Sequence, residues 1–250
     1  MVPLDFDASS RILTRDLGEQ GSLAIRHALI HRRPGLWVDH PRSPGSVLYV
    51  RDANDEPRHV YGVGNAEPAV SWLVGQGWRF SLLAPKTWEG SLRKRSTSLP
   101  KGTVETWIRS RSPGESLAIA VRRLTPDDGP AFHAAAPAWA LGAWGDFNRL
   151  VRSGAAFGVP TLDGGFAAIA WIFEADDRID SCAVAADPRF VRLGLGRAAG
   201  SRLVSHIESD RKKSAVWTVA AENVAAKALA RSLGFSPRAL ETVVRWGYGK

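Results

Sequence analysis

A glycine-rich turn is the part of the sequence whose residues could most directly do chemistry. Residues 187–197 read Asp-Pro-Arg-Phe-Val-Arg-Leu-Gly-Leu-Gly-Arg, between a predicted strand and a predicted helix. Gly194 and Gly196 let the main chain approach a ligand closely, and the start of a helix supplies unpaired N–H groups and a dipole that favours an anion. Arg192 and Arg197 flank the turn and can pair with phosphate oxygens. The segment therefore predicts a pyrophosphate-binding turn.

The glycine spacing excludes two well-known nucleotide-binding loops. Gly200 falls one position beyond the third-glycine site of a dinucleotide-binding fingerprint, and no acidic residue closes a following strand. No Gly-Lys-Ser/Thr sequence follows, as a Walker loop requires. A Gly-x-Gly turn alone is also an ordinary entry into a helix, so the surrounding elements must decide.

Those surrounding elements alternate between strands and helices. Apolar β-rich runs predict strands, whereas apolar residues at helical spacing, caps and glycine stops predict helices. The predicted elements are strands at residues 118–123, 166–173, 179–185, 215–220 and 241–246, and helices that open at Thr125 and cover 197–208 and 224–233. Trp139, Trp144 and Phe147 lie in the helical region after Thr125, and we expect them to anchor the core rather than to stack on bases.

The first half of the chain shows a different pattern, of short strands broken by turns. Residues 35–39 and 46–50 are β-rich, and residues 68–74 predict a short helix that ends at glycines. A polar stretch with Pro and Gly at residues 109–115 has the composition of a linker. We therefore predict an α/β protein, α+β by stricter usage, with a smaller α+β domain at residues 1–112 and a larger domain at residues 116–250.

Two ordered motifs of the second half resemble the GNAT acetyltransferases. Residues 188–197 resemble the coenzyme A loop of that family, although Val191 stands where the family usually has Arg or Gln. Residues 223–235 resemble the helix with the pattern Asn, Ala, Leu-Tyr and Gly-Phe, with Ala230 in place of the tyrosine. The resemblance covers residues 118–246. More loosely, the first half is similar to the N-terminal region of tandem, zwittermicin-resistance-type acetyltransferases, which implies a degenerate GNAT-like companion domain.

The resemblance implies a mixed, mostly antiparallel sheet flanked by helices and acetyl-CoA as co-substrate. The strand before the loop and the strand after the following helix would separate to admit the pantetheine arm, and a backbone N–H would polarise the acetyl carbonyl. Asn223 would either face the pantetheine or cap its helix. The implied cofactor-binding residues are Ala183, Val184, Ala186, Arg192, Leu193, Gly194, Leu195, Gly196, Arg197 and Asn223.

In this family the amine attacks the thioester directly, so an ammonium proton must leave and the thiolate must be protonated. Ala230 cannot supply the proton, so solvent is the expected donor. Candidates for the acid and base are Glu174 and Asp180, near the strand that should face the acceptor, and Tyr248 near the terminal strands. An acidic hairpin turn, with Asp176, is the alternative explanation of the two carboxylates.

Other reactive residue types carry weaker signals. Cys182 could form an acyl-enzyme, but a single Cys in a hydrophobic strand is usually an inert core residue. His133 and His206 have no partners at metal-ligand spacing, so we expect no metal site.

The composition limits the location and the partners. The single cysteine fits a reducing compartment, and the N-terminus lacks the layout of a secretory signal, so we expect a cytoplasmic protein. The longest apolar run, at residues 166–173, is too short to cross a membrane. The net charge of +8 is spread along the chain, so we do not expect a nucleic-acid partner. Neither the strands nor the tryptophans indicate an oligomer interface.

Three functions remain in competition. The first is an acetyl-CoA-dependent N-acetyltransferase that acts on a primary amine of a small molecule or a protein. The second, favoured by Ala230 and by the absence of an obvious base, is a non-catalytic acyl-CoA-binding module. The third, a nucleic-acid-binding protein, rests on charge alone.

Overall fold

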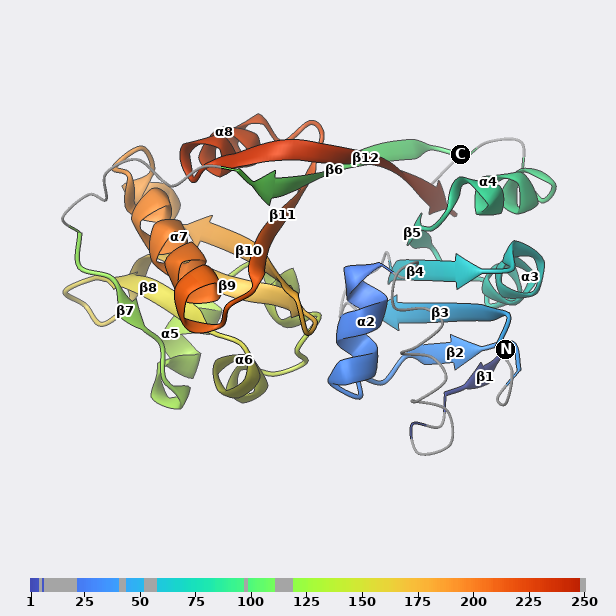
Figure 1. The fold of residues 1–250 in the computed structure, drawn as a ribbon, viewed down its shortest axis with the longest axis horizontal. Helices are drawn as coiled ribbons and strands as arrows, with labels where there is room; N and C mark the ends of the chain where they lie inside the picture. The colour runs from blue at the N-terminus through green and yellow to red at the C-terminus, as the bar shows by residue number, and fades with distance from the viewer. Residues whose placement is uncertain are drawn as a thin grey trace. The chain divides into compact units, whose positions relative to one another are not determined.

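The computed structural model describes residues 1–4, 6, 22–40, 44–51, 58–96, 99–110 and 119–247. The chain divides into two compact units (Figure 1): the first is Met1–Val104 together with Glu241–Lys250, and the second is Glu105–Leu240. The division that the sequence predicts between residues 112 and 116 lies outside the described residues and stays a prediction. No helix in the described ranges is long and apolar enough to cross a membrane.

The second unit contains a mixed, mostly antiparallel sheet, as predicted. Its strands are β7 (Arg122–Arg123), β8 (Ala156–Pro160), β9 (Phe166–Ala175), β10 (Ile179–Ala186) and β11 (Ser214–Ala220), with the part of β6 (Lys101–Arg109) from Glu105 on and the part of β12 (Phe235–Trp246) up to Leu240. They lie in the order β12-β6-β11-β10-β9-β8-β7. The pairs from β7 to β10 are antiparallel, whereas β10 and β11 are parallel.

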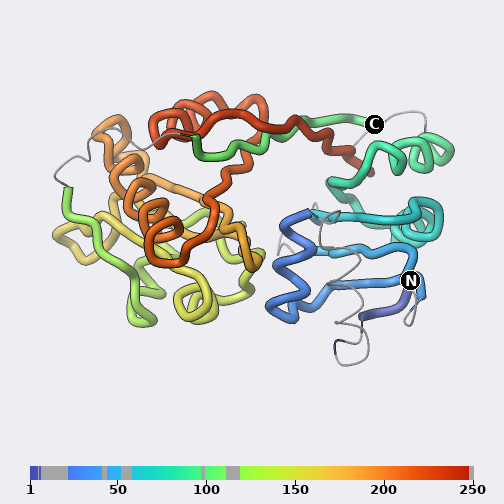
Figure 2. Tube along the Cα trace, viewed as in Figure 1, coloured from blue at the N-terminus to red at the C-terminus, as the bar shows by residue number. Residues whose placement is uncertain are grey.

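Helices flank this sheet. They are α5 (Gly129–Ala135), α6 (Phe147–Ser153), α7 (Leu195–Ser205) and α8 (Val224–Ser232), with the short turns η1 (Pro126–Asp128), η2 (Ala138–Leu141) and η3 (Pro188–Phe190) and the π-helical turn η4 (His206–Asp210). Asp146 caps α6 through a bond from the Arg149 N–H of 2.7 Å, which fixes where that helix begins. Figure 2 shows how α7 connects β10 to the strand β11 beside it.

The core of the second unit is rich in aromatic residues. Trp107, Trp144 and Trp171 are fully buried, and Phe147 is 5% exposed, so the predicted role of Trp144 and Phe147 as core anchors is confirmed. Trp139 is 50% exposed, so the same prediction for Trp139 is wrong. The physical reason is its place on η2, where buried neighbours already fill the space against the sheet.

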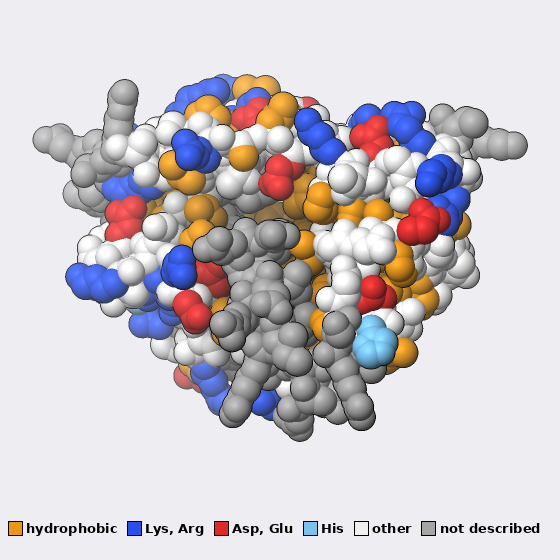
Figure 3. All heavy atoms as spheres, turned by 45° about the vertical axis from the view of Figure 1, so that its right-hand side comes forward, with side chains coloured by type: hydrophobic (Ala, Val, Ile, Leu, Met, Phe, Trp, Pro, Cys, Tyr) orange, Lys and Arg blue, Asp and Glu red, His pale blue; other side chains and the backbone are white. Residues whose placement is uncertain are grey.

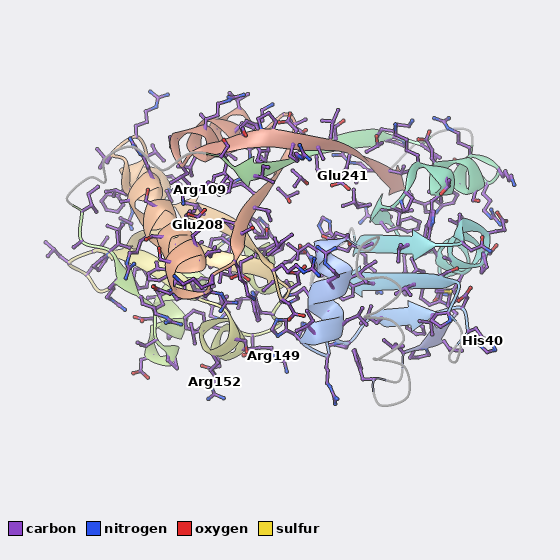
Figure 4. The ribbon with its side chains drawn as sticks, viewed as in Figure 1. His40, Arg109, Arg149, Arg152, Glu208 and Glu241 are labelled. Carbon is purple, nitrogen blue, oxygen red and sulfur yellow. The ribbon has the colours of Figure 1, made fainter. Side chains whose placement is uncertain are left out.

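Strand β6 is fixed in the second unit by alternate side chains along it. The Glu105 carboxylate pairs with Lys227 at 3.1 Å, and the Trp107 ring receives the Arg231 guanidinium at 5.0 Å. Arg109 meets Glu208 of η4 at 2.5 Å, and Figure 4 shows these two side chains close together. The sequence prediction places these residues of β6 in the first domain, because their contact partners in the second unit are distant in the chain and leave no local signal.

The first unit is a smaller α/β assembly. Its remaining elements are β1 (Val2–Pro3), α2 (Leu23–Ile30), β2 (Leu36–Val38), β3 (Ser46–Arg51), β4 (Arg58–Gly64), α3 (Ala66–Gly75), β5 (Phe80–Leu83) and α4 (Lys86–Arg93). The pairs β1–β2, β2–β3 and β3–β4 are antiparallel, β4 and β5 are parallel, and the end of β12 pairs with β5 antiparallel. The predicted strands at 35–39 and 46–50 and the predicted helix at 68–74 are confirmed as β2, β3 and α3.

Three sequence predictions need correction. Of the strand predicted at 118–123, only Arg122–Arg123 is a strand among the described residues, because only those two pair with β8. The strand predicted at 241–246 begins at Phe235, and its residues 237–241 are exposed, so no apolar pattern marks the added part. The helix predicted at 197–208 ends as α7 at Ser205 and continues as the π-helical turn η4.

Candidate functional site

The parallel strands β10 and β11 pair only at one end. Their register joins Ile179 to Ser214, Asp180 to Ala215 and Ser181 to Val216. Both strands continue beyond that point, to Ala186 and Ala220. A register shift in the β9–β10 pairing lies between Ser181 and Cys182, where the parallel pairing ends. The backbone groups of residues 182–186 on the β11 side therefore face the space where the strands part.

The glycine-rich turn joins this open end of β10 to α7. Asp187 accepts a bond of 2.8 Å from the Arg189 N–H, and the bonds from Arg189 hold the pKa of the Asp187 carboxyl below its ordinary value. Arg192 and Gly194 both have positive φ, of 65° and 77°. Gly194 is the N-cap of α7, a backbone conformation that glycine adopts without strain.

The start of α7 supplies free backbone donors. The carbonyl of Gly194 accepts the first intrahelical bond, from the Ala198 N–H at 3.0 Å. The N–H groups of residues 195–197 precede that bond and have no acceptor within the helix. Three such donors and the positive end of the helix dipole make this terminus suitable for a phosphate group.

The glycines of this segment serve different purposes. A Cβ on Gly200 would lie 2.8 Å from Leu233 Cδ1, so Gly200 is required for the packing of α7 on its neighbour. A Cβ on Gly196 would lie 3.5 Å from Val184 Cγ1, an ordinary contact, so packing alone does not require glycine there. A glycine without a packing reason at a helix start is consistent with close approach of a ligand to the backbone.

The predicted cofactor-binding residues other than Asn223 lie on β10 and on the turn that joins it to α7. Ala183 is buried, Val184 is half-buried and Ala186 is exposed along β10. On the turn, Arg192 and Leu193 are exposed, and Gly194, Leu195, Gly196 and Arg197 are half-buried. Leu193, Val191 and Val224 at the start of α8 are 60%, 55% and 71% exposed, so apolar surface borders the turn.

Asn223 caps α8. Its Oδ1 accepts a bond of 3.0 Å from the Ala226 N–H, which is the capping role that the sequence left open beside a pantetheine contact. Ala230, which replaces the tyrosine of the family pattern, is fully buried within the core. No phenol therefore stands at that position.

The candidate acid and base residues lie in different surroundings. Asp180 is fully buried and paired with Arg211 and Lys213, so its oxygens are engaged in structural contacts. Asp176 accepts bonds from the N–H groups of Arg178 and Ile179, which is the hairpin-turn role expected of an acidic turn. Glu174 is 9% exposed on β9, opposite Ser181 at the end of the parallel pairing. Tyr248 lies outside the described residues.

Cys182 has the properties of a core residue. It is 4% exposed, and burial, followed by the charges of Asp180 and Glu208, raises the pKa of its thiol far above the ordinary value. The thiolate, which is the nucleophilic form, is therefore disfavoured. This argues against an acyl-enzyme at Cys182.

The histidines make local contacts. His206 Nδ1 lies 2.7 Å from Asp210 Oδ2, and His133 packs edge-on against Phe132. No group of three or more metal-ligating side chains occurs among the residues that the structure describes.

The charged residues on the visible face of Figure 3 are mixed. Basic, acidic and apolar side chains alternate there in small groups, without a continuous basic stripe among the described residues. Arg149 and Arg152, both on α6, are exposed and are labelled in Figure 4.

Comparison with solved structures identifies the fold. The chain is similar to a GCN5-related N-acetyltransferase-like protein from Streptococcus suis 89/1591, with a TM-score of 0.72 and 14% identity over 97% of this chain and 100% of that chain. It is similar to a GCN5-related N-acetyltransferase from Kribbella flavida, with a TM-score of 0.62 and 15% identity over 91% of this chain and 95% of that chain. No family profile and no curated protein sequence matches the chain.

A tandem protein is similar over the full length. A tandem GNAT protein from the clavulanic acid biosynthesis pathway has a TM-score of 0.64 and 11% identity, over 100% of this chain and 98% of that chain. The chain therefore has a GNAT-type fold, and the fold implied by the two sequence motifs is confirmed.

Proposed function

We propose that the second unit binds acetyl-CoA and transfers its acetyl group to a primary amine of a small molecule or a peptide. The observation that carries the proposal is the parting of β10 and β11 beyond Ser181 and Val216, with a glycine-rich helix start at the open end. The proteins with this fold that are named above as N-acetyltransferases support the reaction class.

The chain offers contacts for each part of acetyl-CoA. The N–H groups of residues 195–197 would hold the pyrophosphate, and Arg192 and Arg197 would add charge to the same site. The backbone of residues 182–186 would bond the pantetheine amides, because β11 does not occupy that edge of β10. An N–H of this edge, near the register shift between Ser181 and Cys182, would polarise the acetyl carbonyl.

The chemistry needs a neutral amine close to the thioester. The amine nitrogen attacks the carbonyl carbon, the C–S bond breaks, and coenzyme A leaves as a thiolate that takes a proton from solvent. Attack leaves an extra proton on the nitrogen, and this proton passes to a base of the protein or to water, so that the products are the amide, free coenzyme A thiol and no net change in protons. With Ala230 in the place of the family tyrosine, no side chain of α8 is assigned as the acid.

Glu174 is our candidate for the base. Asp180 is fully buried and held by Arg211 and Lys213. Glu174 stands opposite Ser181, where the parallel pairing ends and the strands part. Replacing Glu174 with Gln should lower kcat at neutral pH and leave the Kd for acetyl-CoA unchanged. An unchanged kcat would remove Glu174 from the mechanism.

Release of free thiol from acetyl-CoA, measured with a panel of primary amines, tests the function. The acetyltransferase proposal expects acceleration by at least one amine, and loss of that acceleration in the double variant R192A/R197A but not in R152A. Calorimetric binding of acetyl-CoA without thiol release for any amine would instead support the non-catalytic acyl-CoA-binding module. Absence of acetyl-CoA binding would contradict both.

A further inference from the structure

Trp139 differs from the other large aromatic residues of the second unit. Trp107, Trp144 and Trp171 are fully buried, whereas half of the Trp139 side chain is exposed. The other strongly exposed large hydrophobic residues among the described positions are aliphatic. Because an exposed indole loses the gain that burial gives to such a large apolar surface, its position calls for an explanation.

Hydrogen bonds of buried indoles hold Trp139 in this position. The Trp171 Nε1–H donates to the Ala140 carbonyl at 3.1 Å, directly next to Trp139 on η2. The Trp144 Nε1–H donates to the Ile172 carbonyl of β9 at 2.7 Å. Both bonds join the η2 region to β9, so the exposed indole sits on a rigid support rather than on a loose loop.

Trp139 covers the aromatic part of β9. Its ring centroid lies 5.6 Å from that of Trp171 and 5.4 Å from that of Phe173, with the Phe173 ring edge-on. Phe173 is the residue of β9 that the register shift leaves without a partner on β10, and its ring and that of Trp171 both contact the Trp139 indole. The three rings form a continuous aromatic wall with one exposed member.

This aromatic wall lies one strand away from the proposed cofactor opening. Trp171 pairs with Ala183 of β10, just beyond the point where β10 and β11 part. Val184 faces α7, since its Cγ1 lies 3.5 Å from a Cβ placed on Gly196. Side chains alternate along a strand, so Ala183 and the wall are on the face opposite α7. An amine approaching the thioester from that face would pass the Trp139 indole.

We propose that Trp139 and Phe173 form an acceptor subsite for arylalkyl amines, in which a short chain carries the primary amine from an aromatic ring. This inference rests on the proposed function. A flat ring can stack on the exposed face of the indole while the short chain carries the nitrogen toward Ala183. One such ring contact gives about fivefold in affinity over an alkyl chain, the ratio equivalent to about 1 kcal/mol.

Equilibrium binding of two amines tests the subsite without requiring turnover. Titration calorimetry of the whole protein with 2-phenylethylamine and with butylamine, each with and without coenzyme A, should show about fivefold tighter binding of the aromatic amine. Trp139→Ala should reduce the ratio of the two affinities to about one. Trp139→Phe should keep most of the preference, and Leu162→Ala, a control at another exposed apolar residue, should keep all of it.

The outcomes separate the subsite from the reaction. Equal affinity for the two amines, no binding of either, or a preference that persists in Trp139→Ala would overturn the subsite. Aromatic preference without thiol release would leave the subsite in place and contradict the acetyltransferase proposal. Thiol release with both amines at equal KM would support the reaction and overturn the subsite.

Discussion

Two runs of elements follow the same order along the chain: β4, α3, β5, α4 and β6, which begins in the first unit, and β10, α7, β11, α8 and β12, which begins in the second. In each run, the two strands around the first helix pair in parallel. The runs differ in the connection between the first strand and its helix. It is Asn65 alone in the first unit and the eight residues 187–194 in the second.

Side chains of the cap and the first turn already occupy the N-terminal end of α3. Asn65 Oδ1 accepts a bond of 3.2 Å from the Glu67 N–H, and the Glu67 carboxylate places a negative charge in the first turn. Pro68, the third residue of the helix, has no N–H to offer. At the start of α7 the cap is Gly194, without a side chain, and no acidic residue lies in the first turn. Only α7 therefore keeps donors available for an anion.

A tryptophan also fills the space beyond the paired part of β4. Trp88, the third residue of α4, lies over Gly62, where an added Cβ would meet its ring at 2.4 Å. Its Nε1–H donates to the Gly64 carbonyl at 2.9 Å. The third residue of α8 is Ala226. The same order of elements thus gives a closed strand end in one unit and an open one in the other, and the side chains around that end determine which.

Of the changes that test the difference between the two strand ends, removal of the Trp88 side chain should have the largest effect on stability. Trp88 is 1% exposed, so Trp88→Ala should lower the free energy of unfolding of the first unit by about 3–5 kcal/mol. Denaturant unfolding followed by fluorescence measures the loss, with Trp139→Ala as a control that should cost much less. We expect no second acetyl-CoA site to appear, because the short connection and Glu67 remain. A second bound acetyl-CoA in Trp88→Ala would show that the tryptophan alone closes the first unit.

Removing the charges beside the turn should weaken only the second unit's site. R192A/R197A should raise the Kd for acetyl-CoA about 100-fold, since each charge-assisted hydrogen bond to phosphate contributes about 1.5 kcal/mol. The exposed Arg152 on α6 provides the matched control, and R152A should leave the Kd unchanged. Calorimetry at one fixed salt concentration makes the comparison. Equal weakening by R152A would mean that net charge, rather than the turn, attracts the ligand.

The sequence predicts the second unit, whose strand end is open, better than the first unit, whose strand end is closed. Strands β9 and β10 and helices α7 and α8 carry apolar runs, helical spacing and glycine stops, which are local signals. The glycine turn is local as well, so the candidate cofactor residues could be identified before the fold. Tryptophan is usually buried, so the sequence predicts Trp139 in the core; its exposure follows from its place on η2, which the bonds of Trp144 and Trp171 join to β9.

Other features depend on contacts between distant residues. The place of β6 beside β11 rests on ion pairs of Glu105 with Lys227 and of Arg109 with Glu208, more than ninety positions apart. The first part of β12 is exposed and has no apolar alternation. Neither leaves a pattern that a sequence window can detect.

The two asparagine caps provide a matched pair for the role of Asn223. Asn65 and Asn223 cap α3 and α8 through similar side-chain bonds, of 3.2 and 3.0 Å. Asn65→Ala and Asn223→Ala should each cost about 1 kcal/mol in unfolding free energy. If Asn223 only caps its helix, neither change alters the Kd for acetyl-CoA. A rise in Kd confined to Asn223→Ala would instead assign it a pantetheine contact.

We expect the smallest effect on stability at the ion pair of Arg122 and Asp128, which lies outside both runs of elements. The Arg122 guanidinium, with the Thr125 N–H, lowers the pKa of Asp128 to about 2 although partial burial opposes the shift. A lowered folded-state pKa stabilises the protein above the ordinary value near 3.8, and this stabilisation is lost as the pH falls through about 2. Asp128→Ala should therefore cost about 0.5–1 kcal/mol at pH 7, and less below pH 4. A cost independent of pH would contradict the pairing.

The stoichiometry of acetyl-CoA binding tests the central claim most directly. Isothermal titration of the whole protein should show one site per chain, which is lost in R192A/R197A and retained in R152A. Two equivalent sites per chain would mean that the first unit is open despite Trp88 and Asn65. No binding to the native protein would mean that the turn before α7 is only a helix entry, and would contradict the account.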